Sequence, residues 1–358
     1  MLRLRSHIPI GAPARREPAD GTESPMRVVL GFEPAWFHTR CDVDFSERWH
    51  RDPMYRQETL VCMKRELCRA FPSAAQWDLD REDDTWTISG VHGAYPIALA
   101  LGCELAYAPD RWPVIALRPE RPLEEWSELD VRAVAEGETM RDLERQMAAF
   151  EARGRAVHGY LNWQGVLNNA FHVTGERILT AMSDCPQTVH RFLGRLCDLM
   201  ILLARSVQER QRRSGFPVDQ LDVSNCTINM ISPRMYAEFV LPHDRRIAES
   251  FALFGVHTCG WDATPYLELL AGLPRVGYID MGAMSDLRKA RALFPEARRA
   301  VMYSPVRLQD ATLGEIETDM RRICGDYAPC DIVMADIQAT TSDDRVNDLL
   351  AICRKVIG

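Results

Sequence analysis

The chain has 358 residues, of which 46% are hydrophobic and 26% charged, and its formal net charge is −8. This balance is typical of a globular enzyme with a large core. The acidic charge argues against nucleic acid as the main partner, because phosphate binding needs clustered Lys and Arg. No apolar run is long enough to cross a bilayer, so we expect no membrane association.

The eleven cysteines are scattered without the spacing of a disulfide framework. This pattern predicts reduced thiols and a cytoplasmic location. Residues 1–25 are rich in Arg, Pro and Gly and contain no apolar segment of the kind found in secretory signals. We therefore expect a flexible extension over residues 1–25, with Met26 as an alternative start, followed by a single domain over residues 26–358.

From Met26 onward, short runs typical of β-strands alternate with helical patterns. The eight expected strands are 27–32, 86–91, 155–162, 220–225, 255–259, 275–280, 299–303 and 331–336. Apolar residues at spacings of three and four predict helices over 54–70 and 186–213. Alternation repeated eight times predicts an α/β fold, a single (β/α)8 TIM barrel. The alternative is an open doubly wound sheet, but no G-x-G-x-x-G follows the first strand.

Helix ends can be placed from their capping residues. Ser232-Pro233 and Thr264-Pro265 each put a capping hydroxyl before a proline suited to the first turn. Thr312 and Glu315 have the spacing of a capping box. Gly325 is expected to end the helix that this box begins.

Active sites of such barrels lie at the carboxyl ends of the strands. Reading each strand end gives the following candidates: His38, Arg40, His92, Trp163, Asn225, Cys226, His257, Cys259, Asp280, Tyr303 and Asp336. We assign proton transfer to Asp280, His92 and Tyr303, and substrate binding to His38, Arg40, Trp163 and Asn225. The i, i+2 spacing of His257 and Cys259 points both side chains to one face of a strand.

The segment Met230–Pro242, MISPRMYAEFVLP, resembles the I-S-P-x-x-[FY]-x-E-F-V-L-P stretch of the uroporphyrinogen decarboxylase superfamily. It is followed by His257-Thr258-Cys259-Gly260 and by Thr264–Leu270, which resemble the H-x-C-G and P-x-L-x-x-L of that superfamily. Pro34-Ala35-Trp36 is similar to its P-V-W motif. The resemblance extends from about residue 27 to the C-terminus and implies the same barrel.

Two branches of this superfamily differ in chemistry. In the porphyrinogen decarboxylase branch, an arginine follows P-V-W and an aspartate lies near the second strand. Here the arginine position holds Thr39, and the aspartate position falls near His92. Phe171 stands where a tyrosine is expected. The methyltransferase branch transfers a methyl group from a corrinoid protein to a thiol. There the H-x-C motif and a later cysteine bind zinc, which stabilises a thiolate.

By resemblance to that branch, His257 and Cys259 would be zinc ligands. The position of the later cysteine holds Ala335, so the third ligand must come from elsewhere. Asp336 could supply an oxygen, or Cys226 a sulfur. The alternatives are a metal-independent decarboxylase or lyase acting on a cyclic anionic substrate, and a non-catalytic ligand-binding protein. Related barrels often dimerise, so a homodimer is compatible with the resemblance.

Overall fold

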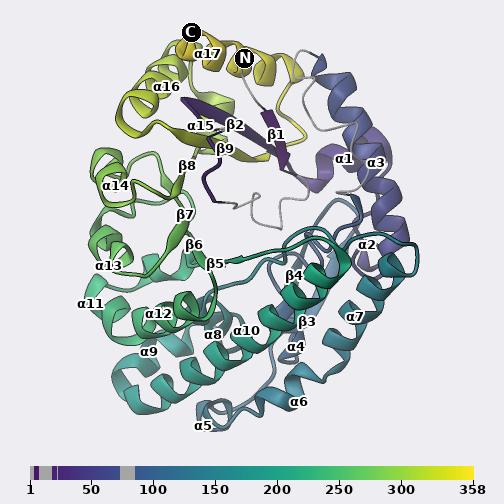
Figure 1. The fold of residues 1–358 in the computed structure, drawn as a ribbon, viewed down its shortest axis with the longest axis vertical. Coiled ribbons are helices and arrows are strands. Elements are labelled where there is room, and N and C mark those ends of the chain that lie inside the picture. Colours follow the sequence, from purple (N-terminus) through teal and green to yellow (C-terminus); the bar gives the residue numbers. More distant parts are fainter. Residues whose placement is uncertain (1–3, 8–17, 22, 73–84) are drawn as a thin grey trace.

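The computed structural model describes residues 4–7, 18–21, 23–72 and 85–358 (Figure 1). Its strands are β1 (Leu4–His7), β2 (Met26–Phe32), β3 (Glu104–Ala108), β4 (Arg111–Leu117), β5 (Gln220–Ser224), β6 (Leu253–His257), β7 (Val276–Gly282), β8 (Arg298–Met302) and β9 (Cys330–Ile337). All neighbours in the order β1-β2-β9-β8-β7-β6-β5 are parallel. Strands β3 and β4 form a separate antiparallel hairpin.

The helices before the hairpin are α1 (Pro34–Cys41), α2 (Glu47–Arg51), α3 (Pro53–Ala70) and α4 (Pro96–Ala100). Those between the hairpin and β5 are α5 (Leu123–Ser127), α6 (Val131–Ala135), α7 (Glu138–Glu151), α8 (Val166–Thr174), α9 (Arg177–Asp184) and α10 (Pro186–Ser214). Those after β5 are α11 (Pro233–Met235), α12 (Leu241–Ser250), α13 (Leu267–Ala271), α14 (Leu287–Leu293), α15 (Pro305–Asp310), α16 (Leu313–Tyr327) and α17 (Asp343–Ile357). Short 3-10 or π segments cover Cys226–Met230, Tyr236–Val240 and Thr264–Tyr266.

The architecture is a (β/α)8 barrel, as the alternation of the sequence predicts. Six of the eight expected strands are present as β2 and β5 to β9, and helices surround them (Figure 1). The other two positions make only isolated parallel bridges, Thr87 to His158 and Gln164 to Ser224. The chain there follows the course of strands two and three without a continuous ladder.

Three strands were not expected from the sequence. β1 pairs with β2, so residues 4–7 of the expected N-terminal extension belong to the sheet. The hairpin β3–β4 inserts after the second strand position, and Pro109-Asp110 form its turn. Its alternating exposure is typical of a strand pair with one face in water.

The predicted helix starts are largely present. The Ser232 hydroxyl accepts a hydrogen bond from the Met235 N–H, and the Thr312–Glu315 capping box is complete. Two details differ. Thr264 is the first residue of a 3-10 turn, with Ala263 before it, and α16 continues past Gly325 to Tyr327, where the Ala328-Pro329 step ends it. Within the described residues, no helix is long and apolar enough to cross a membrane.

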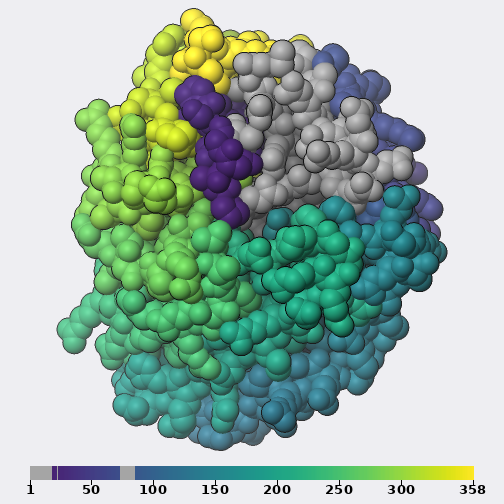
Figure 2. Space-filling view, viewed as in Figure 1, coloured from purple at the N-terminus to yellow at the C-terminus, as the bar shows by residue number. Residues whose placement is uncertain are grey.

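A buried cluster of charges closes the amino-terminal end of the barrel. Arg27 at the start of β2 makes two hydrogen bonds of 2.8 and 2.6 Å to Asp331 at the start of β9. Arg298, at the start of β8, donates to Asp20 at 2.7 Å and to Glu23 at 3.2 Å. Figure 2 shows the purple N-terminal segment against the green and yellow C-terminal part of the surface, as these contacts require. This end of the barrel therefore has a structural role.

Candidate functional site

His257 is the last residue of β6, and both of its ring nitrogens have partners. Nδ1 lies 2.8 Å from Asp280 Oδ2, and Nε2 lies 3.0 Å from Cys259 Sγ. The carboxylate can only accept, so Nδ1 carries the proton and Nε2 presents its lone pair. His257 is thereby prepared to act as a ligand through Nε2.

Asp280, on β7, is held rigidly behind His257. Its Oδ1 accepts from the Thr258 N–H at 2.9 Å, and its Oδ2 also accepts from the Tyr278 hydroxyl at 2.9 Å. The residue is almost fully buried. A carboxylate that receives several donors keeps its charge and its position. Asp280 therefore fixes the tautomer and orientation of the His257 ring.

Cys226 completes a group of three at the carboxyl ends of β5 and β6. Its sulfur, the Cys259 sulfur and a His257 ring nitrogen all lie within 4.8 Å of one another. Cys259 has a left-handed backbone, with φ +63°, where the chain turns sharply after β6. The turn packs on Gly282, where a Cβ would lie 2.3 Å from the Gly260 carbonyl oxygen. Only glycine at 282 allows this approach.

The three ligand candidates line a cavity of about 630 Å³. The other predicted residues on its surface are Asp280 and Asp336. One wall carries amides that bond to each other: Asn168 Nδ2 donates to Gln164 Oε1 at 2.7 Å, and Gln164 Nε2 donates to Asn162 Oδ1 at 2.8 Å. A cavity of this volume can hold a small substrate together with a small part of a larger substrate.

Asp336 also lines the cavity, next to Ala335. Its carboxyl interacts with that of Glu33, and burial together with Asp336 raises the pKa of Glu33 to about 8. Burial also raises the pKa of Asp336. The group of closely spaced ligand atoms contains Cys226 and not Asp336. Of the two substitutes for the absent cysteine at position 335, the geometry therefore favours Cys226.

His38 and Arg40 lie outside the cavity lining. His38 Nδ1 pairs with the Val43 carbonyl oxygen at 2.9 Å. Arg40 stacks on Trp36 and pairs with Asp343 of α17 at 2.6 Å. The sequence places both shortly after the first strand, and in the structure both belong to α1. Arg40 joins α1 to α17, whereas His38 contacts the segment just after α1, and neither residue lines the described cavity.

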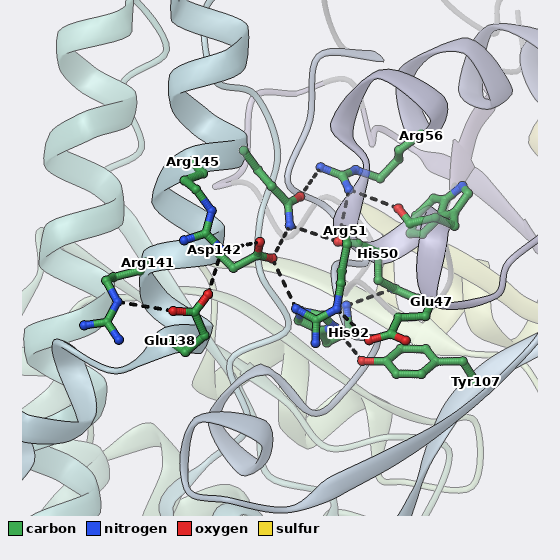
Figure 3. Close-up of polar contacts among 12 residues, drawn as sticks. Glu47, His50, Arg51, Arg56, His92, Tyr107, Glu138, Arg141, Asp142 and Arg145 are labelled. Atoms are coloured by element: carbon green, nitrogen blue, oxygen red, sulfur yellow. Dashed lines mark hydrogen bonds and ion pairs between the residues drawn. The ribbon is translucent and has the colours of Figure 1, made fainter.

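His92 likewise lies away from the cavity, in the buried polar cluster of Figure 3. Its ring Nδ1 pairs with the Tyr107 hydroxyl at 3.0 Å, and its backbone N–H donates to His50 Nδ1 at 2.9 Å. Arg56, fully buried beside them, donates to the Gln146 amide oxygen. This cluster joins α2, α3 and α7 to the second strand position. The proton-transfer role expected for His92 has no support from its position.

This cluster predicts a loss of stability in acid. Burial lowers the pKa of His92 to about 4 and lowers that of His50 well below its usual value. The unfolded chain takes up these protons near pH 6.5, whereas the folded chain does not. The free energy of unfolding should therefore fall as the pH drops from about 6.5 to 4. Denaturant titrations at several pH values should show a shallower fall in the His92→Gln variant, and an unchanged slope would contradict this account.

The last three predicted residues are also in the protein interior rather than at the cavity. Trp163 is buried in the core. Asn225 is fully buried: its N–H donates to the His257 carbonyl oxygen at 2.8 Å and its amide donates to Asp244 at 2.7 Å. Tyr303 donates to Asp319 at 2.8 Å. Asn225 thus positions the end of β6 without facing the cavity.

Several cavity residues were not expected from the sequence. Tyr95, Arg118 and His172 line it: Tyr95 immediately precedes α4, Arg118 immediately follows β4, and His172 lies in α8. The hairpin signal Pro109-Asp110 between two β-type runs could have indicated β4. No sequence signal indicates that the hairpin bends over the cavity, because that depends on tertiary packing.

Comparison with known proteins identifies the family. Residues 93–335 match the family described as Uroporphyrinogen decarboxylase (URO-D). This match covers more than half of the chain. The chain belongs to the uroporphyrinogen decarboxylase family. No curated protein matches the sequence.

Solved structures show the same fold. A methyltransferase from Methanosarcina mazei superposes with a TM-score of 0.62 at 13% identity, covering 97% of this chain and 96% of that one. A Listeria monocytogenes structure assigned as a vitamin-B12-independent methionine synthase matches at a TM-score of 0.34 and 12% identity, covering 46% of this chain and 56% of that one. The second likeness is too low to use. The first shows that a methyltransferase has the same fold as this chain.

Proposed function

We propose that this URO-D family member is a methyltransferase that binds a small thiol at a zinc site and receives the methyl group from a corrinoid protein. One observation carries the proposal. Two cysteine sulfurs and a histidine nitrogen lie within 4.8 Å of one another on the cavity surface, and Asp280 orients the histidine. The Methanosarcina neighbour supports the reaction class as an analogy of fold.

The ligand set fits zinc. Tetrahedral zinc takes thiolates at about 2.3 Å and imidazole at about 2.0 Å, which places neighbouring ligand atoms within the spacing seen for Cys226, His257 and Cys259. Three protein ligands leave a fourth position for a substrate. A carboxylate bonded to the second ring nitrogen is usual for a ligating histidine, as Asp280 is here.

When bound, zinc would hold the acceptor sulfur as a thiolate at neutral pH. The protein's own groups do the rest. Asp280 keeps the proton on His257 Nδ1, which leaves Nε2 as the ligand. Asp336 lines the same cavity, and burial makes its carboxylate a stronger base than an ordinary aspartate, suited to accept the thiol proton. The resulting thiolate would attack the methyl carbon, and the corrinoid would leave with the bonding electron pair.

The assignment of Cys226 as the third ligand can be tested by removing its thiol and introducing one at position 335. Cys226→Ser should weaken zinc affinity by more than about 100-fold, because a direct ligand contributes more than a partner that only orients one. Adding Ala335→Cys, which restores the family position in the same cavity, should recover much of the affinity. Zinc content and competition with a chelator measure both. Cys185→Ser, at the start of α10 and away from the cavity, is the control. Unchanged zinc binding in Cys226→Ser would contradict the assignment.

Exposed apolar side chains that follow three of the barrel strands support a protein as methyl donor. Met230, Met284 and Val306 are 52%, 68% and 66% exposed, and they follow β5, β7 and β8. Val114 and Leu117 of the hairpin are also exposed. Exposed apolar groups gathered on one face often mark a partner site. Met230, Met284 and Val306 follow the carboxyl ends of their strands, and Val114 lines the cavity, so the corrinoid protein would dock around the cavity.

The docking surface gives a separate prediction. Met230→Asp combined with Met284→Asp should raise the KM for the methyl-corrinoid protein about tenfold or more, because charged groups would then face an apolar contact. The affinity for the thiol should stay the same. The matched control is Leu202→Asp on α10, which is also exposed but lies outside this face. Equal effects on thiol and corrinoid protein would argue against docking at these residues.

A second candidate, a metal-independent decarboxylase or lyase, is favoured by the Glu33–Asp336 pair. With a pKa of about 8, Glu33 carries a proton at neutral pH and could pass it to a carbanion through Asp336. Carbon dioxide release that survives removal of zinc and the His257→Ala change would favour this reaction. Ligand retention without turnover of any methyl donor would instead indicate a non-catalytic binding protein.

A further inference from the structure

Three polar side chains gather on one part of the cavity surface, and none of them belongs to the candidate metal site. Tyr95 immediately precedes α4, Arg118 immediately follows β4, and His172 lies in the last turn of α8. All three line the cavity that holds Cys226, His257 and Cys259. A ligand at the metal site could therefore extend to them without leaving the cavity.

The backbone of His172 holds the Arg118 guanidinium in place. Arg118 Nε donates to the His172 carbonyl oxygen at 2.9 Å. The Tyr95 ring packs against the edge of the His172 ring at a centroid distance of 4.9 Å. Among the residues that the structure describes, no carboxylate forms an ion pair with Arg118. One nitrogen of its planar fork is thus used for positioning, and the two terminal nitrogens remain for a ligand.

Arg118 also dominates the charge of this part of the cavity. It is the one Lys or Arg among the described lining residues. Burial, with a smaller effect of Arg118, lowers the pKa of His172 to about 4, so this imidazole is neutral at pH 7. Burial raises the pKa of Tyr95, which keeps its hydroxyl proton available for donation. A positive fork beside a neutral donor is a suitable receptor for an oxyanion.

The amides on the neighbouring wall differ in this respect. Asn168, Gln164 and Asn162 form a chain of hydrogen bonds, and Asn168 Oδ1 also accepts from the Thr227 N–H at 3.0 Å. They satisfy each other and shape the wall. Arg118 is exposed and its only hydrogen bond within the described residues comes from Nε. Anion recognition in this cavity is thus concentrated at Arg118.

We propose that Tyr95 and Arg118, the latter positioned by His172, form an anion subsite that binds a carboxylate on the acceptor thiol. The proposal rests on the proposed function, since it names the substrate class for that site. The acceptor is then a small thiol that also carries a carboxylate, with both groups inside this cavity. The sulfur binds at Cys226, His257 and Cys259, and the carboxylate binds at Arg118. This places the anion-binding role on the hairpin rather than at Arg40.

The test compares three small probes by isothermal titration of the protein as purified. 3-Mercaptopropionate carries both groups, 3-mercapto-1-propanol lacks the carboxylate, and 3-hydroxypropionate lacks the sulfur. The wild-type protein should bind 3-mercaptopropionate about tenfold more tightly than 3-mercapto-1-propanol, as expected for a charged hydrogen bond. Arg118→Gln should reduce this ratio to about one. Arg118→Lys should keep part of it, because the charge remains without the fork.

Two further variants separate this subsite from general charge effects. Tyr95→Phe should lower the carboxylate preference about threefold, as loss of one neutral donor would. Arg111→Gln removes another exposed arginine, at the other end of β4 and outside the cavity lining, and should leave the preference unchanged. A carboxylate preference that survives Arg118→Gln, or is absent from the wild type, would overturn the subsite. So would the absence of measurable binding by any probe.

The sulfur preference reports separately on the proposed function. Preference for 3-mercaptopropionate over 3-hydroxypropionate should disappear in Cys259→Ser, while the effect of the carboxylate persists. If the wild type shows no sulfur preference but an Arg118-dependent carboxylate preference, the metal-based function fails and the subsite stands. If sulfur preference is present without carboxylate preference, the subsite fails and the function stands.

Discussion

Replacing His257 with alanine is expected to lower methyl transfer to a thiol by about 1,000-fold or more and to remove zinc from the protein. Activation of a nucleophile by a bound metal contributes several kcal/mol, and each 1.4 kcal/mol corresponds to about a tenfold change in rate. The side chain supplies one of three closely spaced ligand atoms, so its loss should affect both metal content and activity. Initial rates with a methyl-corrinoid donor and metal analysis would measure the two effects.

Two companion variants make this result specific. Asp280→Asn preserves shape but replaces the carboxylate that receives the His257 Nδ1 proton, so zinc affinity should fall about 10- to 100-fold. His38→Gln should retain wild-type activity, because His38 contacts the Val43 carbonyl oxygen outside the cavity. Full activity in His257→Ala, or a loss in His38→Gln as large as that in His257→Ala, would refute this assignment.

The Asp331→Ala variant is expected to lose about 3–5 kcal/mol of unfolding free energy, the usual effect of removing one partner from a buried ion pair. Asp331 and Arg27 are both almost completely buried, and Arg298 Nε lies 3.6 Å from the same carboxylate. Without Asp331, two buried arginines lose their shared counter-charge. Urea unfolding followed by circular dichroism would measure the change.

The exposed pair of Arg40 and Asp343 provides the matched control. It has the same bidentate geometry, at 2.8 and 2.6 Å, but both side chains are partly exposed. Asp343→Ala should therefore change the unfolding free energy by no more than about 1 kcal/mol. Equal losses in the two variants would mean that burial does not determine the contribution of Asp331. The Asp331→Ala variant should leave metal binding intact, because the charge cluster and the cavity lie at opposite ends of the barrel.

The barrel was predictable because its strands carry a local signal. β2 and β5 to β9 are short, mostly apolar runs, and each begins and ends within two residues of the expected bounds. The capping box of Thr312 and Glu315 likewise predicts the start of α16, because its hydrogen bonds join residues only three positions apart. The hairpin β3–β4 was missed, since its sequence lies between two expected strands and contributes no barrel position. The weak ladder at Thr87 and His158 also has no sequence signal, as strand pairing depends on tertiary neighbours.

The site was predictable where a motif fixed the geometry, and not elsewhere. His257 and Cys259 lie two residues apart at one strand end, so their proximity follows from local structure. Asp280 was expected from its strand end alone, and its contact with His257 agrees with that position. Arg40 and His92 follow strands in the sequence, but partners from distant segments bind them. Such partners, Asp343 for Arg40 and Tyr107 for His92, cannot be read from local spacing.

Zinc K-edge X-ray absorption on protein purified without chelators tests the central claim most directly. The account predicts stoichiometric zinc bound by two sulfurs and one imidazole nitrogen, from Cys226, Cys259 and His257. The zinc that Cys226→Ser retains should have one sulfur fewer, and His257→Ala should contain no zinc. An additional sulfur ligand that appears on zinc when a thiol substrate is added would show the open fourth coordination position. Protein that contains no zinc, or a zinc spectrum that none of these substitutions alters, would contradict the account.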